Sequence, residues 1–377
     1  MTQPASRPVT PVAVEVATSP PYRLTIGPGA SGGLPAWVSL HNPGARCALV
    51  TDDHVAVLHA RPLRDRMIDE GLQVEMIVIP SGEIHKTRAT KEKVEDSLIE
   101  AGLGRDSLIV AMGGGMVTDL AGFVAATFMR GVPCVLVPTT LLAMVDASIG
   151  GKTAVDHPRG KNLIGAFHQP VAVFIDVDAL ATLPEREFRS GLAEVVKTGV
   201  IRSRELFNGI AAAPDRLATR EPDLMTGLIA AACRIKAEVV AADEREGDLR
   251  KILNFGHTIG HAIEALSGFE LAHGEAVSIG MVAEARMAVR LGVLAREEAS
   301  EIETTLEALG LPVRLPPGPE QMTPWKIVEA ARRDKKGRSG RIVYVLPSSV
   351  GEMARGPGGY GIPLEDVLAA EVLEELA

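Results

Sequence analysis

Several residue types that mark particular classes of protein are scarce in this chain of 377 residues. Aromatic residues make up 3% of the chain, and 39 lysines and arginines stand against 48 aspartates and glutamates, for a net charge of −9. Base stacking and attraction to a phosphate backbone are therefore both disfavoured, and we expect no nucleic-acid partner. No apolar run is long enough to cross a bilayer, and residues 1–21 lack the pattern of a signal peptide. We expect a cytoplasmic protein with no membrane partner.

Cysteine is also scarce, which excludes a disulfide framework as the basis of the fold. Cys47, Cys134 and Cys233 lie far apart in apolar or helical contexts and form no Cys-x-x-Cys pair. We interpret them as reduced thiols of the core with no evident chemistry.

The remaining composition, with 46% hydrophobic residues, is sufficient for two domains with buried cores. In the first half, short β-branched runs alternate with helical patterns, which predicts a parallel sheet covered by helices. The predicted strands are 47–51, 74–80, 108–112, 134–138 and 171–175, and the predicted helices between them are 91–101 and 119–129. From about residue 183 the pattern becomes mainly helical, at 186–200, 223–243, 257–267, 274–291 and 295–309, with one late strand at 342–346. We therefore predict an α/β, Rossmann-like nucleotide-binding domain at 1–180 and a mainly α-helical, metal-binding domain at 181–377.

Two histidine-containing turns, residues 254–261 and 272–275, carry the strongest functional signal. His257 and His261 are four residues apart and would share one helix face, whereas the longer spacing to His273 lets the chain turn back to the same point. Glu194, in the helical pattern at 190–197, is the best candidate for a carboxylate ligand. Two imidazoles, one carboxylate and an open position are typical of a catalytic zinc site. The spacing leaves open whether His261 or His273 is the second imidazole.

A run of three glycines links a predicted strand to a predicted helix. Gly113–Gly115 follow the apolar strand, and Asp119 is expected to open the helix. Glycines let the backbone approach a ligand closely, and a helix N-terminus favours a pyrophosphate. Asp52 follows another predicted strand, where a carboxylate can take ribose hydroxyls. These features predict a dinucleotide site.

Cations set among glycines and apolar residues suggest a pocket for an anion. Lys152, Lys161 and Lys197, with Arg130 at a predicted helix end, could bind a phosphate and a carboxylate together. A nucleotide cofactor, a catalytic metal and a small anionic substrate together indicate polyol or sugar chemistry.

At this point the chain strongly resembles the 3-dehydroquinate synthases of the sugar phosphate cyclase family, over roughly residues 20–360. The matching motifs are Gly113–Gly115 with 119–123, then 137–153, 160–170, 193–197, 235–240, 243–246, the two histidine turns and 334–336. The resemblance implies that Glu194, His257 and His273 hold Zn²⁺, with Co²⁺ as an alternative, and that His261 faces the substrate.

The same resemblance implies further site residues and a homodimer. The NAD site would be lined by Asp52, Glu83, Lys86, Gly114, Gly115, Asp119, Thr139, Thr140, Asp146, Lys152 and Lys161. The substrate would be bound by Arg130, Asp146, Asn162 and Lys236, and the catalytic residues would be Lys152, Lys197, Arg250, Asn254, His261 and Lys336. Arg130 is expected to reach the site of the neighbouring subunit.

The implied reaction converts 3-deoxy-arabino-heptulosonate 7-phosphate, a small anionic sugar phosphate, into 3-dehydroquinate and phosphate in the shikimate pathway. Transient oxidation by NAD is followed by phosphate elimination, re-reduction and an intramolecular aldol closure, without net redox change. An aminodehydroquinate synthase, or another sugar phosphate cyclase of secondary metabolism, is the alternative. A metal-dependent polyol dehydrogenase is an alternative of a different class, although a simple alcohol has no phosphate for the lysine and arginine set to bind.

Overall fold

The chain forms two compact units in the computed structural model, which describes residues 11–268, 270–316, 322–334 and 341–377. The first unit runs to Leu183 and also includes Arg220–Ala237, and the second comprises Pro184–Thr219 and the residues from Glu238 onward. Helix α9 (Pro222–Ala242) therefore belongs to the first unit over most of its length and to the second at its end.

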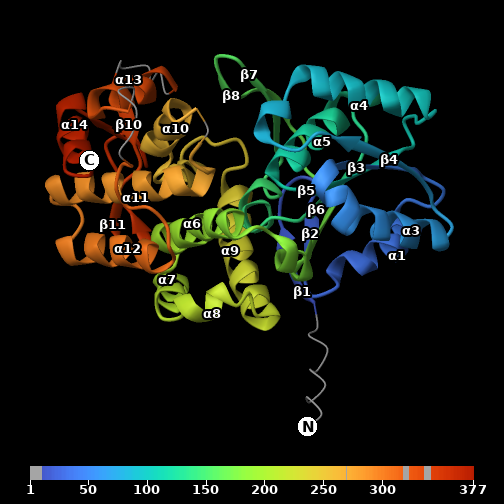
Figure 1. The fold of residues 1–377 in the computed structure, drawn as a ribbon, viewed down its shortest axis with the longest axis horizontal. Helices are drawn as coiled ribbons and strands as arrows, with labels where there is room; N and C mark the ends of the chain where they lie inside the picture. The colour runs from blue at the N-terminus through green and yellow to red at the C-terminus, as the bar shows by residue number, and fades with distance from the viewer. Residues whose placement is uncertain (1–10, 269, 317–321, 335–340) are drawn as a thin grey trace, which may run out of the picture. The chain divides into compact units, whose positions relative to one another are not determined.

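A seven-stranded sheet forms the centre of the first unit (Figure 1). The strand order is β1-β2-β9-β6-β5-β3-β4, and every pairing is parallel except that of β1 with β2. The strands are β1 (Val12–Val16), β2 (Tyr22–Gly27), β3 (Arg46–Asp52), β4 (Gln73–Ile79), β5 (Leu108–Gly113), β6 (Cys134–Pro138) and β9 (Ala172–Asp176). All residues of β5 and β6 are buried, as expected of central parallel strands with both faces covered. The α/β prediction is confirmed, but the sequence patterns did not reveal β1 and β2.

Helices of the first unit pack against this sheet and against each other. They are α1 (Leu34–His41), α2 (Asp53–Val55), α3 (Arg61–Asp69), α4 (Arg88–Glu100) and α5 (Gly115–Thr127). Shorter helical segments are η1 (Ala30–Gly33), η2 (Ala56–Ala60), η3 (Glu83–His85), η4 (Phe128–Arg130), η5 (Ala143–Ala147) and η6 (Val177–Thr182). The prediction that Asp119 opens α5 is wrong by one turn, because the helix starts after Gly114, an extended residue without a capping side chain.

Lys152 and Lys161 lie on two neighbouring strands. Strands β7 (Lys152–His157) and β8 (Gly160–Phe167) pair as an antiparallel hairpin. The hairpin packs closely on α5, where a Cβ added to Gly122 would lie 2.6 Å from Cγ2 of Thr153. Glycine at this position lets the hairpin approach the helix that carries Asp119.

The second unit is mainly helical, as predicted. It contains α6 (Glu185–Arg202), α7 (Arg204–Ala211), α8 (Pro214–Ala218), η7 (Leu249–Asn254), α10 (His257–Leu266), α11 (His273–Arg290), α12 (Arg296–Ala308), α13 (Pro324–Asp334) and α14 (Asp366–Glu374). The late strand predicted at 342–346 is found as β10 (Ile342–Tyr344), and three more short strands accompany it: β11 (Pro347–Ser349), β12 (Glu352–Met353) and β13 (Ile362–Leu364). β10 pairs with β13 and β11 with β12, both antiparallel.

Helices α10 and α11 meet at glycines. A Cβ added to Gly280 of α11 would lie only 1.9 Å from the carbonyl oxygen of Gly256, the residue that precedes α10. Gly256 itself has a φ of 77°, a conformation that favours glycine. This close crossing fixes the start of α10, and with it His257, against α11, whose first residue is His273.

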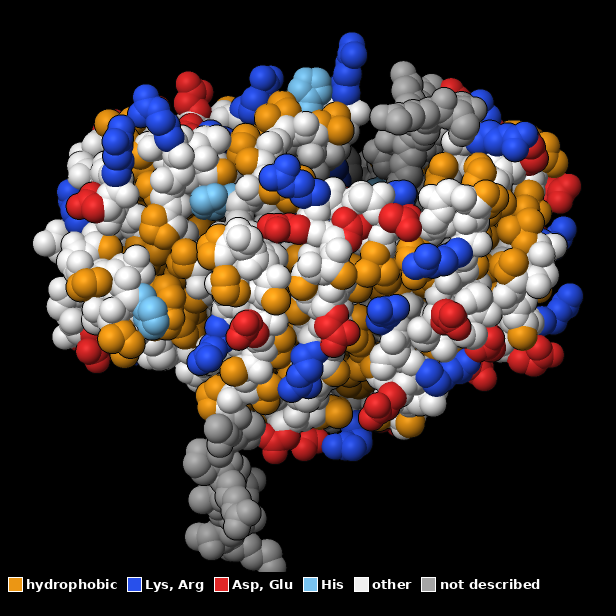
Figure 2. All heavy atoms as spheres, turned by 180° about the vertical axis from the view of Figure 1, so that it is seen from behind, with side chains coloured by type: hydrophobic (Ala, Val, Ile, Leu, Met, Phe, Trp, Pro, Cys, Tyr) orange, Lys and Arg blue, Asp and Glu red, His pale blue; other side chains and the backbone are white. Residues whose placement is uncertain are grey.

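The exposed surface mixes charges of both signs. On the face shown in Figure 2, lysines and arginines are interspersed with aspartates and glutamates. Among the helices in the described part of the chain, none combines the length and the apolar character needed to cross a membrane.

Candidate functional site

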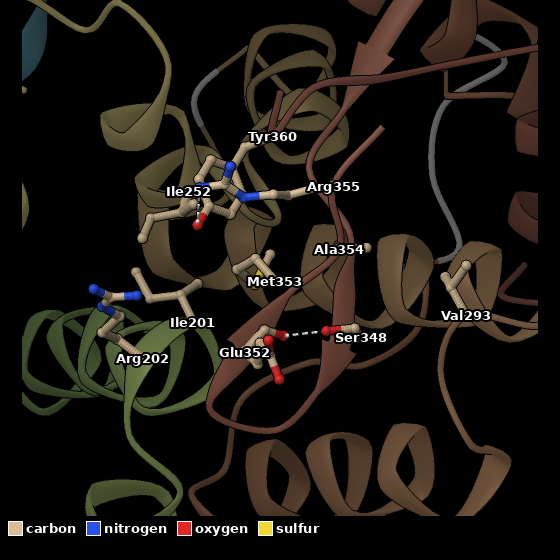
Figure 3. Close-up of a pocket in the computed structure, with 10 residues that line it drawn as sticks. All are labelled: Ile201, Arg202, Ile252, Val293, Ser348, Glu352, Met353, Ala354, Arg355 and Tyr360. Atoms are coloured by element: carbon tan, nitrogen blue, oxygen red, sulfur yellow. Dashed lines mark hydrogen bonds between the residues drawn. The ribbon is translucent and has the colours of Figure 1, made fainter. Parts of the chain in front are cut away.

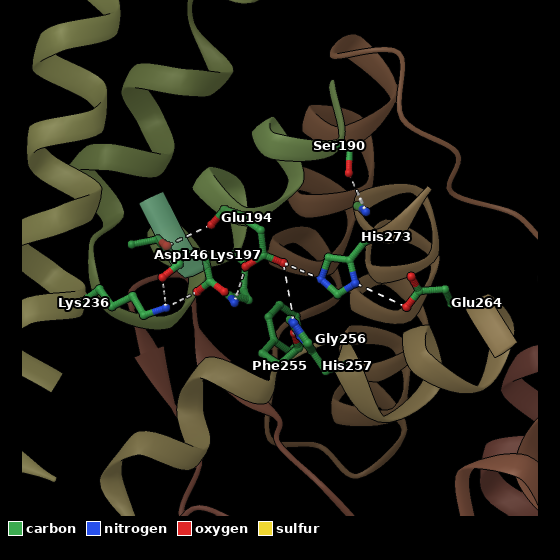
Figure 4. Close-up of polar contacts among 12 residues, drawn as sticks. Asp146, Ser190, Glu194, Lys197, Lys236, Phe255, Gly256, His257, Glu264 and His273 are labelled. Carbon is green, nitrogen blue, oxygen red and sulfur yellow. Dashed lines mark hydrogen bonds and ion pairs between the residues drawn. The ribbon is translucent and has the colours of Figure 1, made fainter. Parts of the chain in front are cut away.

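Glu194, His257 and His273 form a compact cluster in the second unit (Figure 4). Glu194 lies in α6, and the two histidines are the first residues of α10 and α11. Oε1 of Glu194 lies 3.6 Å from Nε2 of His257 and 3.5 Å from Nε2 of His273. Three donor atoms therefore converge on one point, as a metal site with one carboxylate and two imidazole ligands requires.

The far ring nitrogen of each of these histidines faces an acceptor. Nδ1 of His257 lies 3.1 Å from the carbonyl oxygen of Phe255, and Nδ1 of His273 lies 3.4 Å from Oε2 of Glu264. A proton on Nδ1 leaves the Nε2 lone pair directed at the point shared with Glu194. Metal-ligating histidines in proteins are commonly oriented in this way, by a carbonyl or a carboxylate on the other nitrogen.

A second set of donors, His261, Glu264 and His273, is equally compact, with its ligand atoms within 4.8 Å of one another. The ring centroid of His261 lies 5.1 Å from that of His257 and 5.8 Å from that of His273, so distance between rings does not separate the two sets. The carboxylate oxygens do separate them. Oε1 of Glu194 faces the Nε2 atoms of both His257 and His273, which suits a shared ligand point, whereas the Glu264 carboxylate faces Nδ1 of His273. The geometry therefore favours Glu194, His257 and His273.

The protonation states of the cluster also suit a cation. Burial opposes ionisation of Glu194, but the neighbouring Lys197 and the two imidazoles hold the pKa of Glu194 well below its usual range. Burial, reinforced by the Lys197 charge, lowers the pKa of His257 well below its usual value, so this ring is neutral. Burial also disfavours the charged form of His273, yet hydrogen bonds to Glu194 and Glu264 raise its pKa to about 9. A bound cation would replace the proton on that ring.

Lys197 forms an ion pair with Glu194 one turn along α6, on the carboxylate oxygen that does not face the histidines. Only 2% of the Lys197 side chain is exposed. The ammonium group is thus held in a dry environment beside the metal-ligand cluster, where a charge interacts strongly with whatever binds there.

Three of the predicted cofactor residues lie at one edge of the sheet in the first unit. Asp52 ends β3, Gly114 follows β5 and Thr139 follows β6, and these strands are neighbours, so their carboxyl ends share one edge. Oδ1 of Asp52 accepts hydrogen bonds from the amides of His54 and Val55. Oγ1 of Thr139 is buried and has no hydrogen-bond partner among the described residues, which fits a site that a ligand completes.

The glycine run packs closely against the segment that follows β6. A Cβ on Gly114 would lie 3.1 Å from Cγ2 of Thr140, and one on Gly115 would lie 3.4 Å from Cβ of Ala147. The amides at the start of α5 follow directly, so a phosphate could reach both the backbone and the positive end of the helix.

Lys86 joins residues that the sequence assigned to two different sites. Its Nζ donates to Oδ2 of Asp119 at 2.6 Å and to Oδ1 of Asn162 at 2.6 Å, and it lies 3.9 Å from Oε1 of Glu83. Oε1 of Glu83 in turn pairs with Nζ of Lys161 at 3.4 Å. Burial works against the charge on Lys86, but Asp119 and Glu83 raise its pKa above the usual value. The charged Lys86 side chain therefore links Asp119 of α5 to Asn162 of the β7–β8 hairpin.

Another buried lysine of the first unit, Lys236 in α9, donates to the carbonyl oxygen of Asp146 at 2.6 Å and to its Oδ1 at 2.5 Å. This pair brings together two residues of the predicted substrate set. Lys152, at the start of β7, and Arg130, at the end of η4, are exposed.

Predicted residues of the second unit cluster on and beside η7. Arg250 is 2% exposed and donates through Nη1 to the carbonyl oxygen of Glu244, while Nδ2 of Asn254 donates to Oε1 of Glu246 at 2.7 Å. Asp243 fixes the start of this segment by accepting the amide of Arg250 at 2.9 Å. The remaining catalytic candidate, Lys336, lies outside the described residues.

Three residues of the site were missed from the sequence. Glu264 orients His273, Ser190 accepts the amide of Gly274 at 2.9 Å, and Oε2 of Glu284 accepts the amide of Gly256 at 2.8 Å. Glu264 lies three residues after His261 on a predicted helix, and that shared face was a usable signal. Nothing local distinguishes Ser190 or Glu284 from ordinary helix residues.

A hollow of about 450 Å³ elsewhere in the second unit contains none of the predicted ligands (Figure 3). It is lined by Ile201, Arg202, Ile252, Val293, Ser348, Glu352, Met353, Ala354, Arg355 and Tyr360. Ile252 belongs to η7, so this hollow borders the segment that carries Arg250. We place the candidate site at the donor cluster, because its atoms converge and its burial explains their protonation.

Comparison with known proteins now identifies the family. Residues 76–190 match the model of the 3-dehydroquinate synthase N-terminal region, and residues 191–337 match that of the C-terminal region. A 3-dehydroquinate synthase of Synechococcus sp. is 44% identical over 360 residues, which cover 94% of this chain and 95% of that protein. The chain belongs to the 3-dehydroquinate synthase family. The resemblance inferred from the motifs is thereby confirmed.

Solved structures of related cyclases have the same fold. A 2-deoxy-scyllo-inosose synthase complexed with carbaglucose-6-phosphate, NAD⁺ and Co²⁺ superposes with a TM-score of 0.89 at 25% identity, over 97% of this chain and 100% of that one. A 2-epi-5-epi-valiolone synthase from Streptomyces hygroscopicus with NAD⁺ and Zn²⁺ bound gives a TM-score of 0.84 at 29% identity, over 94% and 96%.

Proposed function

We propose that this chain is a 3-dehydroquinate synthase, which converts 3-deoxy-arabino-heptulosonate 7-phosphate into 3-dehydroquinate and phosphate with catalytic NAD and a divalent metal. The observation that carries the proposal is the Glu194, His257 and His273 cluster in a chain that shares 44% of its residues with a 3-dehydroquinate synthase over nearly its full length. The two related cyclases that bind NAD⁺ with Co²⁺ or Zn²⁺ support the same pair of cofactors here.

Glu194, His257 and His273 would hold the metal, because they offer one ionised carboxylate oxygen and two imidazole nitrogens at one buried point. When bound, the metal supplies Lewis-acid polarisation of a substrate hydroxyl, and NAD supplies a reversible hydride acceptor. Lys197 keeps the Glu194 carboxylate ionised, and Glu264 orients the ring of His273. Both residues prepare the ligand set before the substrate arrives.

The first unit would bind NAD at the carboxyl ends of β3, β5 and β6. A pyrophosphate would bind at the start of α5, where Gly114 and Gly115 carry no side chain, and the buried hydroxyl of Thr139 lies at the same edge of the sheet. Lys86 holds Asp119 of α5 by a charged hydrogen bond. The other proposed NAD residues are Asp52, Glu83, Thr140, Asp146, Lys152 and Lys161.

The substrate carries a phosphate and a carboxylate, and the cationic residues match both groups. Arg250 keeps its charge although it is 2% exposed, and a guanidinium in a dry site binds a dianion strongly. His261 and Asn254 offer an imidazole and a side-chain amide for the departing phosphate. The full proposed substrate set is Arg130, Asp146, Lys152, Asn162, Lys197, Lys236, Arg250, Asn254, His261 and Lys336.

We also propose a homodimer in the cytoplasm. Arg130 is exposed, with a φ of 73° that sets its backbone apart from the preceding helix, and it would reach the site of the neighbouring subunit. We expect activity to be lost when dilution separates the subunits. We also expect the Arg130→Ala variant to stay dimeric but to be inactive.

The experiment that tests the proposal measures phosphate release from 3-deoxy-arabino-heptulosonate 7-phosphate, with the amino analogue in parallel, in the presence of Zn²⁺ and NAD. We expect faster turnover of the oxygen substrate and no turnover by the Glu194→Ala variant. Preference for the amino analogue would assign the chain to the amino branch. Retained turnover with retained zinc in Glu194→Ala would contradict the assigned metal site.

A further inference from the structure

One face of α6 contacts the turn that carries His273. Arg186, Ser190 and Glu194 follow each other at intervals of four residues, so they project from the same side of the helix. Each of them contacts the segment 270–275. The three contacts differ in chemistry, and only that of Glu194 involves a proposed metal ligand directly.

Arg186, at the exposed end of this helix face, forms hydrogen bonds with the segment 270–275. Its Nε donates to Oε1 of Glu275 at 2.9 Å, and its Nη2 donates to Oε2 of the same carboxylate at 2.6 Å. Nη2 also donates to the carbonyl oxygen of Glu270 at 2.5 Å. Oε2 of Glu275 accepts the amide of Ala272 at 2.8 Å, which is the glutamate half of a capping box at the start of α11. The guanidinium thus binds one residue before His273 and one residue after it.

Ser190 and Glu194 complete the contact further along α6. Oγ of Ser190 accepts the amide of Gly274 at 2.9 Å, as drawn in Figure 4, and a Cβ on Gly274 would lie 2.1 Å from the Ser190 carbonyl oxygen. The backbone next to His273 therefore lies directly on α6. Oε1 of Glu194 then meets Nε2 of His273.

We propose that Arg186 is a positioning residue for the metal site: its bidentate pair with Glu275 fixes the turn before α11 and so places His273 against Glu194. The inference rests on the proposed role of His273 as a ligand. Metal–ligand distances tolerate changes of only about 0.2 Å, so a loosened turn lowers metal affinity. Groups that orient ligands from outside typically account for a 10- to 100-fold change in affinity.

The same pair contributes little to the stability of the unit. The Arg186 side chain is 55% exposed, and exposed ion pairs contribute about 0–1 kcal/mol to the free energy of unfolding. The Arg186→Ala substitution therefore distinguishes a role of Arg186 in positioning His273 from a role in overall stability. Positioning predicts weaker metal binding with an almost unchanged melting temperature of the zinc-free protein.

The test measures the Zn²⁺ dissociation constant of the full chain, by competition with a chromophoric chelator, together with the Tm of the zinc-free protein. Arg186→Ala and Glu275→Gln are the informative variants, because glutamine still accepts the Ala272 amide but loses the charged pair. Arg189→Ala is the matched control. It removes the exposed ion pair that Arg189 forms with Glu185 at 2.9 Å on the same helix.

We expect Arg186→Ala and Glu275→Gln each to weaken zinc binding about tenfold, and their combination to weaken it no further. The zinc affinity of Arg186→Lys should lie between that of Arg186→Ala and that of the unsubstituted chain. Arg189→Ala should bind zinc like the unsubstituted chain. Dissociation constants within twofold of the unsubstituted chain in both informative variants, or an equal loss in Arg189→Ala, would overturn the inference. Failure of the unsubstituted chain to bind zinc would instead overturn the proposed metal site, and the inference with it.

Discussion

Substituting Gly280 by alanine tests whether the crossing of α10 and α11 sets the metal site. The added Cβ would lie 1.9 Å from the carbonyl oxygen of Gly256, whereas ordinary contact begins at 3.4 Å, so the two helices must separate by up to about 1.5 Å. Overpacking of this kind typically costs about 1–3 kcal/mol. Alanine in a helix interior recovers at most about 1 kcal/mol of that through its higher helix propensity.

We therefore expect Gly280→Ala to lower the free energy of unfolding by about 2 kcal/mol, which corresponds to a Tm decrease of roughly 4–8 °C for a unit of this size. Because His257 follows Gly256 directly, the same shift moves one proposed ligand by far more than the roughly 0.2 Å that a zinc site tolerates. Zinc affinity should fall at least tenfold.

Thermal unfolding of the zinc-free protein and a zinc competition titration measure the two effects. Gly209→Ala in α7 is the control, because a Cβ there meets nothing within 4 Å. The control should bind zinc normally and be as stable as the unsubstituted chain or slightly more so. Normal zinc affinity and normal stability in Gly280→Ala would refute the claim that this crossing positions His257.

Three further predictions concern charged groups. Glu194→Gln should weaken zinc binding by more than about 100-fold and stop turnover, because it removes the only carboxylate in the proposed ligand set; a zinc titration that matches the unsubstituted chain would contradict this. Asp119→Asn should lower the free energy of unfolding by about 3 kcal/mol, since it leaves Lys86, which is 3% exposed, with only the more distant Glu83 carboxylate at 3.9 Å; urea unfolding with an unchanged midpoint would count against the buried pair. Zinc affinity should rise about tenfold per pH unit from pH 7 and level off near pH 9, because the pKa of His273 is raised to about 9 and its proton must leave before the metal binds. A pH-independent dissociation constant over that range would show that His273 does not have to lose a proton.

Local patterns were sufficient to predict the central strands and several long helices, and they indicated Glu194 and His257 as donor residues with either His261 or His273 as the third. Continuous apolar runs predicted β5 and β6 because both faces of a central parallel strand are buried. The first strands β1 and β2 were missed, since their mixed burial gives no such run. The start of α5 was misplaced because Gly114 offers no capping side chain, whereas Asp119 does.

Residues that act through tertiary contacts could not be found from the sequence. Spacing alone did not decide between His261 and His273, because the rings of both lie within 6 Å of that of His257 in the folded unit. The decisive features are the atoms opposite each ring nitrogen, from Glu194 and Glu264, and these come from separate helices. The resemblance to the family selected His273 over His261 as the second imidazole ligand, but it did not give the physical reason.

The measurement that tests the central claim most directly counts the phosphate formed per NAD molecule, with NAD far below the substrate concentration, while NADH absorbance is followed. If the hydride removed from 3-deoxy-arabino-heptulosonate 7-phosphate returns to the same substrate molecule, many phosphates form for each NAD and no NADH accumulates. Accumulation of one NADH for each substrate consumed, without phosphate release, would contradict the proposed cyclase and indicate a dehydrogenase.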